Sequence, residues 1–401
     1  MNHPPVHPPV PSPVRPPVPP AARTGLAGGP VRPDVASLAA RSRRARRRDR
    51  RVYTHSHPLL FALLAATRRR PVVRLGRTLL VHGTAAYHEA LTRVPLDRTA
   101  SGTTGGAAAE LTAGDVLFDQ DGAEHRTARR ALSASLNTAA LQRIRPHWQA
   151  VLTERIPERA DGDLDLGIDL DIELVALARE LAGVTAAALT GATGCPHRLA
   201  HAAAEAAAHA ARDHLPGLRR RGQGAAAAAA RLTALLPGPC DAMVAVAAVN
   251  TTVAAVPRAV AWCADAGLWP AVNETTAPRL AAELLRLTAP SPLLPRVAAA
   301  DTTLAGHPVR AGNRLILVAR HAARAHRRPP AGDPTAVSRD ATQAVFGAGP
   351  HACPGAGLAR TQLADVLLAL APLQPVVTRA RVDRRSALPG YAELTLRPGR
   401  P

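Results

Sequence analysis

Residues 346–355 read Phe-Gly-Ala-Gly-Pro-His-Ala-Cys-Pro-Gly, and a helical pattern rich in Ala and Leu follows from Ala356 to Leu370. A cysteine thiolate remains a metal ligand only where hydrogen-bond donors and positive potential lie near the sulfur. The three glycines allow backbone N–H groups to approach Cys353, and the start of the following helix adds its dipole. Phe346 can shield the sulfur from water. The segment therefore predicts a thiolate metal ligand, whereas the alternative is an ordinary buried cysteine in a Gly-rich turn.

Two further stretches place polar residues at helical spacing. Glu283 and Arg286 lie three residues apart, which in isolation gives a routine ion pair on a helix surface. Upstream, Asp121 and Glu124 resemble a capping box, and His125 and Arg129 then share one face of the same helix. For His125 and Arg129 the alternative is simple solvation.

The segment around Cys353 resembles the cysteine-ligand loop of the cytochrome P450 family, Phe-Gly-x-Gly-x-His/Arg-x-Cys-x-Gly, at every fixed position. That family also carries a Glu-x-x-Arg helix, and Glu283 lies seventy residues before Cys353. The resemblance covers about Arg69 to Pro398 and is strongest between Glu283 and Leu370. It implies a mainly α fold with a small β-sheet part and a heme b (iron protoporphyrin IX) held by Cys353.

The resemblance also implies roles for other residues. The Glu283–Arg286 pair would anchor the chain that positions the heme loop. Arg296 would contact a heme propionate, for which the alternative is a solvated arginine. The residues expected to contact the heme propionates are His125, Arg129, Arg296 and His351, and those expected around the ligand itself are Phe346, Gly347 and Gly355.

A long helix is expected to begin near Pro239 and to continue to Ala266, before Gly267. It carries Ala247-Ala248-Val249-Asn250-Thr251-Thr252, which resembles the Ala-Gly-x-Asp/Glu-Thr stretch on the oxygen side of the heme. Thr251 matches the family threonine, and the small Ala247 and Ala248 suggest room above the heme. Ala248 replaces a glycine, however, and Asn250 replaces an acid that can transfer protons. The alternative role for Asn250 and Thr251 is a local bond to the helix backbone.

Composition sets the architecture that we expect. The 401 residues are 47% hydrophobic, enough for a sizeable core. Most of the chain reads helical, with strand-like pairs at 71–75 with 78–81 and at 306–309 with 312–316. The apolar run 242–262 is broken by polar residues, so we predict a buried core helix and no membrane span. Four widely spaced cysteines and no secretory leader suggest a reducing cytoplasm.

The first part of the chain differs in composition from the remainder. Residues 1–33 repeat Pro-Pro and Pro-Val pairs, and 41–51 form an arginine run. We predict a disordered Pro/Arg-rich arm over 1–52 and a single heme-binding domain over 53–401. The net charge of +20 owes much to this arm, which holds eleven arginines against two aspartates. No zinc spacing, helix-turn-helix or aromatic-interleaved basic strand accompanies it, so we do not expect nucleic acid as a partner.

The resemblance implies a monooxygenase that activates dioxygen to oxidise a small organic substrate, as in bacterial specialised metabolism. No flavin or nicotinamide fingerprint is present, so ferredoxin and ferredoxin reductase are the expected electron donors. The arginines expected at the ferredoxin surface are Arg126, Arg130, Arg327, Arg328 and Arg360. Two alternatives stay open. One is oxidative ring closure or coupling, or peroxide-driven oxidation; the other is a non-catalytic helper protein.

Overall fold

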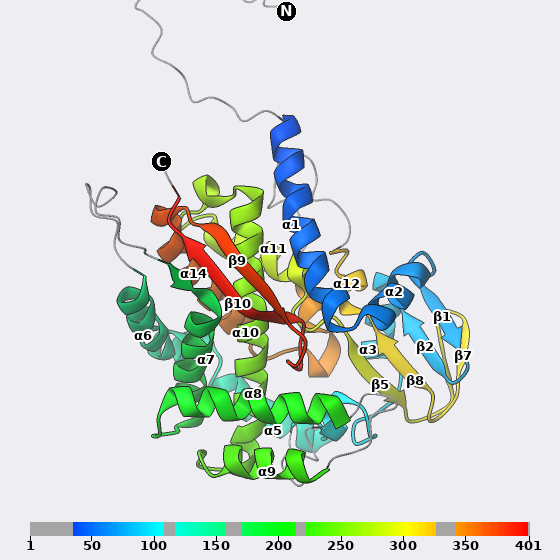
Figure 1. The fold of residues 1–401 in the computed structure, drawn as a ribbon. Helices are drawn as coiled ribbons and strands as arrows, with labels where there is room; N and C mark the ends of the chain where they lie inside the picture. The colour runs from blue at the N-terminus through cyan, green and yellow to red at the C-terminus, as the bar shows by residue number, and fades with distance from the viewer. Residues whose placement is uncertain (1–34, 108–116, 157–170, 214–221, 326–341, 400–401) are drawn as a thin grey trace, which may run out of the picture.

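The Ala- and Leu-rich stretches form helices in the computed structural model, which describes residues 35–107, 117–156, 171–213, 222–325 and 342–399 (Figure 1). The architecture is mainly α with small sheets, as predicted from the sequence. The longer helices are α1 (Val35–Ser56), α2 (Pro58–Thr67), α3 (Thr84–Thr92), α5 (Gly122–Ala134), α6 (Thr138–Arg155), α7 (Leu174–Thr190), α8 (Pro196–Asp213), α9 (Gly222–Thr233), α10 (Pro239–Ala266), α11 (Ala277–Thr288) and α14 (Ala356–Leu370).

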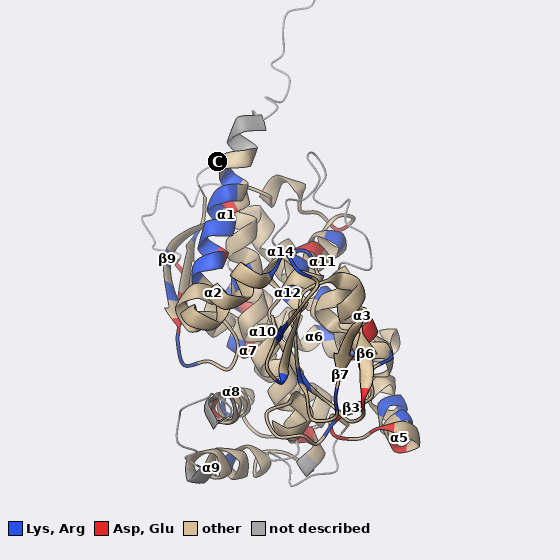
Figure 2. Ribbon diagram, turned by 90° about the vertical axis from the view of Figure 1, so that its right-hand side faces the viewer, with Lys and Arg blue, Asp and Glu red and all other residues tan. Residues whose placement is uncertain are grey.

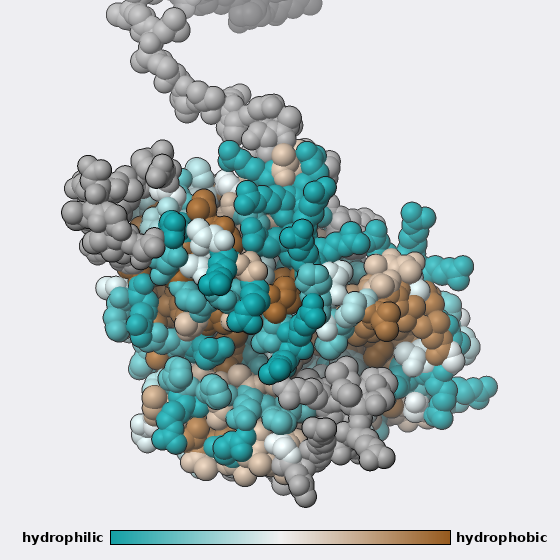
Figure 3. All heavy atoms as spheres, viewed as in Figure 1, coloured by the Kyte–Doolittle hydropathy of each residue, from teal (hydrophilic) through white to brown (hydrophobic). Residues whose placement is uncertain are grey.

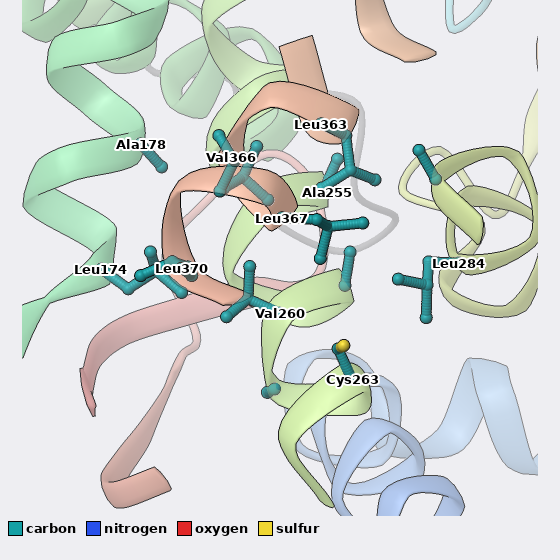
Figure 4. Packing of buried hydrophobic residues seen from close by; sticks show 14 of the residues in the cluster. Leu174, Ala178, Ala255, Val260, Cys263, Leu284, Leu363, Val366, Leu367 and Leu370 are labelled. Atoms are coloured by element: carbon teal, nitrogen blue, oxygen red, sulfur yellow. The ribbon is translucent and has the colours of Figure 1, made fainter. Parts of the chain in front are cut away.

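Helix α10 runs through the centre of the fold. It begins at Pro239 and ends before Gly267, which adopts φ 66°, a left-handed conformation that favours glycine. It packs against α1, α7, α8, α11 and the strand β10 (Gly390–Arg397). Figure 4 shows Val260 and Cys263 of α10 among leucines from α7, α11 and α14. The predicted core helix is therefore confirmed.

Among the described residues, two helical stretches are long and apolar enough to cross a bilayer by length and composition alone. They are Cys240–Ala266 and Gly349–Leu373, in which 56% and 50% of the most apolar window is buried inside the protein. Burial of this kind is what a core helix of a large domain needs. The packing of α10 on its neighbours accounts for its apolar composition.

In Figure 1 a five-stranded sheet lies at one side of the helices, and a longer hairpin formed by β9 (Val376–Asp383) and β10 lies across α7 and α10. The five-stranded sheet has the order β1-β2-β8-β5-β3, and the hairpin predicted at 71–75 and 78–81 is its β1–β2 pair. The second predicted pair is wrong as a pair, because 307–309 joins another strand and 314–317 lies between β2 and β5. The strands are β1 (Val72–Leu75), β2 (Thr78–Val81), β3 (Leu96–Asp97), β4 (Ile172–Glu173), β5 (Leu294–Ala298), β6 (Thr302–Leu304), β7 (His307–Val309), β8 (Arg314–Leu317), β9 (Val376–Asp383) and β10.

The structure corrects the predicted disordered arm over residues 35–52. These residues belong to α1, which buries Ala45, Asp49 and Val52. Their spacings of four and three place them on one face, which packs on α10 and the β9–β10 hairpin. Arg47, Arg50 and Arg51 between them are exposed, whereas Arg48 is half-buried; Figure 2 shows the basic residues of α1 in blue. Residues 1–34 lie outside the described residues.

Candidate functional site

The loop before Cys353 is closed by its own backbone. The Cys353 N–H donates to the Phe346 carbonyl oxygen at 2.7 Å. Gly347 adopts φ 78° and Gly349 adopts φ 69°, conformations that side chains other than glycine rarely take. A Cβ at Gly349 would also lie 3.0 Å from the Leu91 carbonyl oxygen of α3. The glycines therefore allow both the turn and its close approach to α3.

The sulfur of Cys353 has a backbone donor and positive charge nearby, the two kinds of feature that favour a thiolate. Burial raises the pKa of the Cys353 thiol, but the hydrogen bond from the Gly355 backbone N–H and the charges of Arg129 and Arg360 oppose the rise. The Arg360 guanidinium also lies over the Phe346 ring, 4.8 Å from its centroid. A bound cation would reverse the balance toward the thiolate, since it adds the positive charge that the loop alone does not supply in full.

Cys353 keeps some exposed surface, as Cys195 and Cys240 do, whereas Cys263 does not. Cys263 is fully buried in the core, and burial raises the pKa of its thiol. Cys195 is exposed, and hydrogen bonds from the Arg198 and His197 backbone N–H groups lower its pKa. Cys195 is therefore a second thiol with donors, a feature that the sequence analysis did not anticipate, and it makes a useful control for Cys353. Cys240 is also exposed.

Two predicted histidines meet beside the Cys353 loop. The rings of His125 on α5 and His351 stack with their centroids 3.8 Å apart and an interplanar angle of 26°. Burial and nearby cations lower the pKa of both, and that of His351 falls to about 4. Asp121 lies 3.8 Å from His351 Nε2, which is too long for a hydrogen bond. Burial therefore favours the neutral form of both rings.

Arg296 on β5 belongs to the same cluster. Its Nη1 donates to Thr104 Oγ1 at 3.1 Å and to the Pro295 carbonyl oxygen at 2.8 Å. Burial, and after it the charge of Arg98, lowers the pKa of Arg296 to about 10. A lowered pKa is unusual for a guanidinium group. Here it arises because Arg296 is buried close to another cation, with little negative charge to balance the two.

Arg98 is the residue that the sequence analysis missed. It follows β3, and its charge acts on His125, Arg296 and His351, so it lies among the predicted donors. Burial lowers the pKa of Arg98 too. No motif distinguishes it from the many arginines in this chain, because its place in the cluster depends on the pairing of β3 with β5.

Within the described residues, one nitrogen of each of four side chains in this cluster is buried without a hydrogen-bond partner. They are Arg98 Nε, His125 Nε2, Arg296 Nε and His351 Nε2. Buried polar atoms are nearly always paired, so unpaired donors at one place indicate a missing acceptor. A ligand with two carboxylates and a metal would satisfy the nitrogens and complete the coordination of Cys353. The two propionates and iron of heme fit this requirement.

The Glu283–Arg286 pair lies inside the protein and not on a helix surface. Each side chain is 3% exposed, and Arg286 donates to both carboxylate oxygens of Glu283, at 2.6 and 2.5 Å. Arg286 Nη1 also donates to the Ala323 carbonyl oxygen at 2.8 Å, just after the short helix α12 (Ala319–Ala322). The pair thus joins α11 to the chain that leads toward the Cys353 loop.

On α10, the neighbours Thr251 and Asn250 make different contacts. The Thr251 hydroxyl donates to the Ala247 carbonyl oxygen at 2.7 Å, and its side chain is exposed. Asn250 Nδ2 donates to the Val246 carbonyl oxygen at 2.8 Å and, at 3.4 Å, to a carbonyl oxygen of α8. Ala248 packs with the cluster between α7, α8 and α9. Thr251 and Asn250 therefore both donate to the backbone of their own helix, which is the alternative role expected for them.

Comparison with known proteins identifies the fold. No family model and no curated protein sequence matches the chain. Solved structures do match it. Cytochrome P450epoK bound to epothilone D has a TM-score of 0.68 at 17% identity over 87% of this chain and 98% of its own. CYP108D1 from Novosphingobium aromaticivorans has a TM-score of 0.63 at 22% identity, over 87% of this chain and 97% of its own. CxnD is described as a cytochrome P450 for C–S bond formation in chuangxinmycin biosynthesis. It has a TM-score of 0.67 at 20% identity, over 84% of this chain and 94% of its own. The chain therefore has the fold of the cytochrome P450 family, in agreement with the fold predicted from residues 346–355.

Proposed function

We propose that the protein is a heme-thiolate monooxygenase that oxidises a small organic molecule in the cytoplasm of a bacterium, as part of specialised metabolism. The observation that carries the proposal is the juxtaposition of a thiol held in a Gly-rich loop with buried donors that lack partners. The P450 fold independently supports it.

The chain's own residues bind and orient the cofactor. Cys353 would ligate the iron, with the Gly355 N–H and the charge of Arg129 stabilising its thiolate. Arg98, Arg296 and the two stacked histidines would bind the propionates, and Arg129, whose charge acts on both His125 and Cys353, lies beside them. When bound, a heme with thiolate ligation supplies the redox chemistry that activates dioxygen.

Thr251 is the residue proposed to move protons. Its Oγ1 can release the Ala247 carbonyl oxygen and pass a proton from water toward the oxygen side of the cofactor. Asn250 cannot titrate, and both of its donated bonds go to backbone oxygens of α10 and α8. Proton delivery through Asn250 is therefore not part of the proposal.

Because the Asn250 amide cannot supply protons, a second candidate function stays open. Oxidative ring closure or coupling, or peroxide-driven turnover, can proceed without retaining an oxygen atom from dioxygen, and CxnD is a P450-fold protein described as forming a C–S bond. Mass analysis of the product formed under labelled dioxygen separates the candidates. Incorporation of one labelled atom supports the monooxygenase, and its absence from a product made at full yield supports ring closure, coupling or peroxide-driven turnover.

The proposed electron donors are a ferredoxin and its reductase. Arg126 and Arg130 on α5 are exposed near the Cys353 loop, and Arg360 on α14 is half-buried. Arg327 and Arg328 lie outside the described residues. Because exposed charges are screened by salt, reduction by an acidic ferredoxin should slow as ionic strength rises. A rate that does not depend on salt would remove the electrostatic part of this proposal.

The central test is the optical spectrum of the reduced, CO-bound protein. We expect the red-shifted Soret band of a thiolate-ligated heme, lost in Cys353→Ala and retained in Cys195→Ala. Heme content on purification also tests the alternative of a non-catalytic helper. If the protein binds no heme, or if Cys353→Ala keeps the band, the proposed function is wrong.

A further inference from the structure

A cleft opens between α1 and the β9–β10 hairpin. Its volume is about 500 Å³, within the range of small-molecule sites. Figures 2 and 3 show arginines along α1 and hydrophilic side chains gathered over α1 and the hairpin. The lining residues are Arg48, Arg51, His55, Ala380, Arg381, Val382, Arg384 and Tyr391, none of which belongs to the Cys353 site.

The packing of α1 creates one wall of this cleft. Arg48, Arg51 and His55 follow one another at spacings of three and four, so they occupy one stripe of the helix. Asp49 and Val52 lie on the buried face and hold α1 against the core. The arginine run is therefore not uniformly solvated, because part of it faces the hairpin.

Positive charge exceeds negative charge around the cleft. Asp265 is shared by Arg44, at 3.2 Å, and Arg48, at 2.5 Å. In the same way, Glu393 is shared by Arg381, at 3.4 Å, and a second arginine, at 3.0 Å.

Two further cations have no carboxylate of their own. Arg51 lies on the α1 side of the cleft and Arg384 on the hairpin side. Neither forms an ion pair with a described residue. The two walls thus present guanidinium groups that no acid among the described residues neutralises.

Tyr391 adds a neutral donor. It is 4% exposed and lines the cleft from β10. Burial raises the pKa of its hydroxyl, so the phenol stays protonated at neutral pH and can donate a hydrogen bond.

We propose that this cleft binds a small compound bearing phosphate groups, with at least two negative charges. A carboxylate satisfies a single guanidinium fork, whereas linked phosphates offer enough oxygens for Arg51 on one wall and Arg384 on the other. The cleft is open to solvent, so binding rests on several charge-assisted hydrogen bonds and weakens as salt increases. This site is independent of the proposed function at Cys353.

The experiment is a titration of the full chain with inorganic pyrophosphate by calorimetry, at low and at physiological salt. We expect saturable binding of one pyrophosphate per chain. Arg51→Gln and Arg384→Gln should each raise the Kd about tenfold, since each removes a charge-assisted bond to the anion. Melting temperatures of the variants establish that the fold is intact.

The matched control is Arg47→Gln, which removes the same charge from an exposed position of α1 outside the cleft. It should leave the Kd within about twofold, because it removes no direct contact. If Arg47→Gln weakens binding as much as Arg51→Gln, the anion is held by the general charge of α1 and the proposal is overturned. Absence of binding at low salt overturns it too.

A second arm distinguishes a free phosphorylated compound from a lipid headgroup. The chain is mixed with vesicles of phosphatidylglycerol and, as a control, of phosphatidylcholine, and sedimented. Binding of pyrophosphate without sedimentation identifies a soluble compound. Sedimentation with phosphatidylglycerol alone that is lost in Arg51→Gln and Arg384→Gln identifies a headgroup as the source of the phosphate.

Discussion

Thr251 and Asn250 are adjacent residues with separable chemistry. Only the Thr251 hydroxyl is exposed and able to exchange its bond to the Ala247 carbonyl oxygen for one to water. We expect Thr251→Ala to retain the heme spectrum but to divert reducing equivalents to peroxide, while Asn250→Asp remains equally or better coupled. Product formed per reducing equivalent consumed is measured in both variants and the parent. Full coupling in Thr251→Ala would show that protons arrive through substrate or ordered water.

Arg98 allows a test of the cofactor site that does not depend on activity. Without heme, Arg98 adds to the repulsion that lowers the pKa of Arg296 and His351. Arg98→Gln should therefore leave the melting temperature of the heme-free protein equal or higher. In the heme-loaded protein, the loss of the proposed propionate contact should speed heme transfer to apomyoglobin roughly tenfold.

The matched control for Arg98 is Arg93→Gln, an exposed position at the end of α3. It should change neither measurement. A fall in the melting temperature of heme-free Arg98→Gln, with unchanged heme transfer, would assign Arg98 a purely structural role.

At the scale of elements, a histidine pair links β2 to α12. His82 is 3% exposed, its Nδ1 lies 2.9 Å from His321 Nδ1, and its Nε2 lies 3.0 Å from Thr67 Oγ1 at the end of α2. Burial lowers the pKa of His82 to about 4, below the value of about 6.5 that it has when unfolded. The unfolded chain therefore binds a proton that the folded chain excludes as the pH falls between these values.

It follows that the contribution of His82 to the free energy of unfolding is largest above about pH 6.5 and is lost as the pH falls toward about 4. Each unit of pKa depression corresponds to roughly 1.4 kcal/mol. We expect the free energy of unfolding, measured in urea at pH 7.5 and 5, to fall less in His82→Asn than in the parent. Equal falls in the two proteins would show that His82 titrates normally.

At the scale of the molecule, α1 is joined to the core through Asp49. Its carboxylate accepts from Arg258 of α10 at 2.7 Å and from Arg320 of α12 at 3.0 Å. The side chains of Asp49 and Arg258 are 3% exposed or less. Tyr53 lies beneath both guanidinium groups, 4.3 Å from that of Arg258 and 3.9 Å from that of Arg320. Segments more than two hundred residues apart thus meet in one buried network.

Removing one charge from this network should destabilise the whole fold. Asp49→Asn leaves Arg258 buried without a counter-charge, a change that typically costs about 3–5 kcal/mol. The control is Asp301→Asn, whose partner Arg310 lies 4.0 Å away on the surface and whose loss should cost at most about 1 kcal/mol. Chemical unfolding compares the two. If both variants lose equally little stability, α1 is not integral to the domain.

Local chemistry allowed the sequence alone to determine the Cys353 loop, the central helix from Pro239 and the β1–β2 hairpin. Turn glycines, helix-start prolines and apolar periodicity act over a few residues, so their patterns are visible in the chain itself. The tertiary structure decided the rest. The sequence of the arginine run indicates a solvated segment, but Asp49 within it binds Arg258, 209 residues away. Arg98 is like any other arginine in the sequence, and the pairing of β3 with β5 places it in the cluster. The cleft beside α1 exists only once the hairpin packs there, because the field of a charged side chain depends on neighbours that are close in space and distant in sequence.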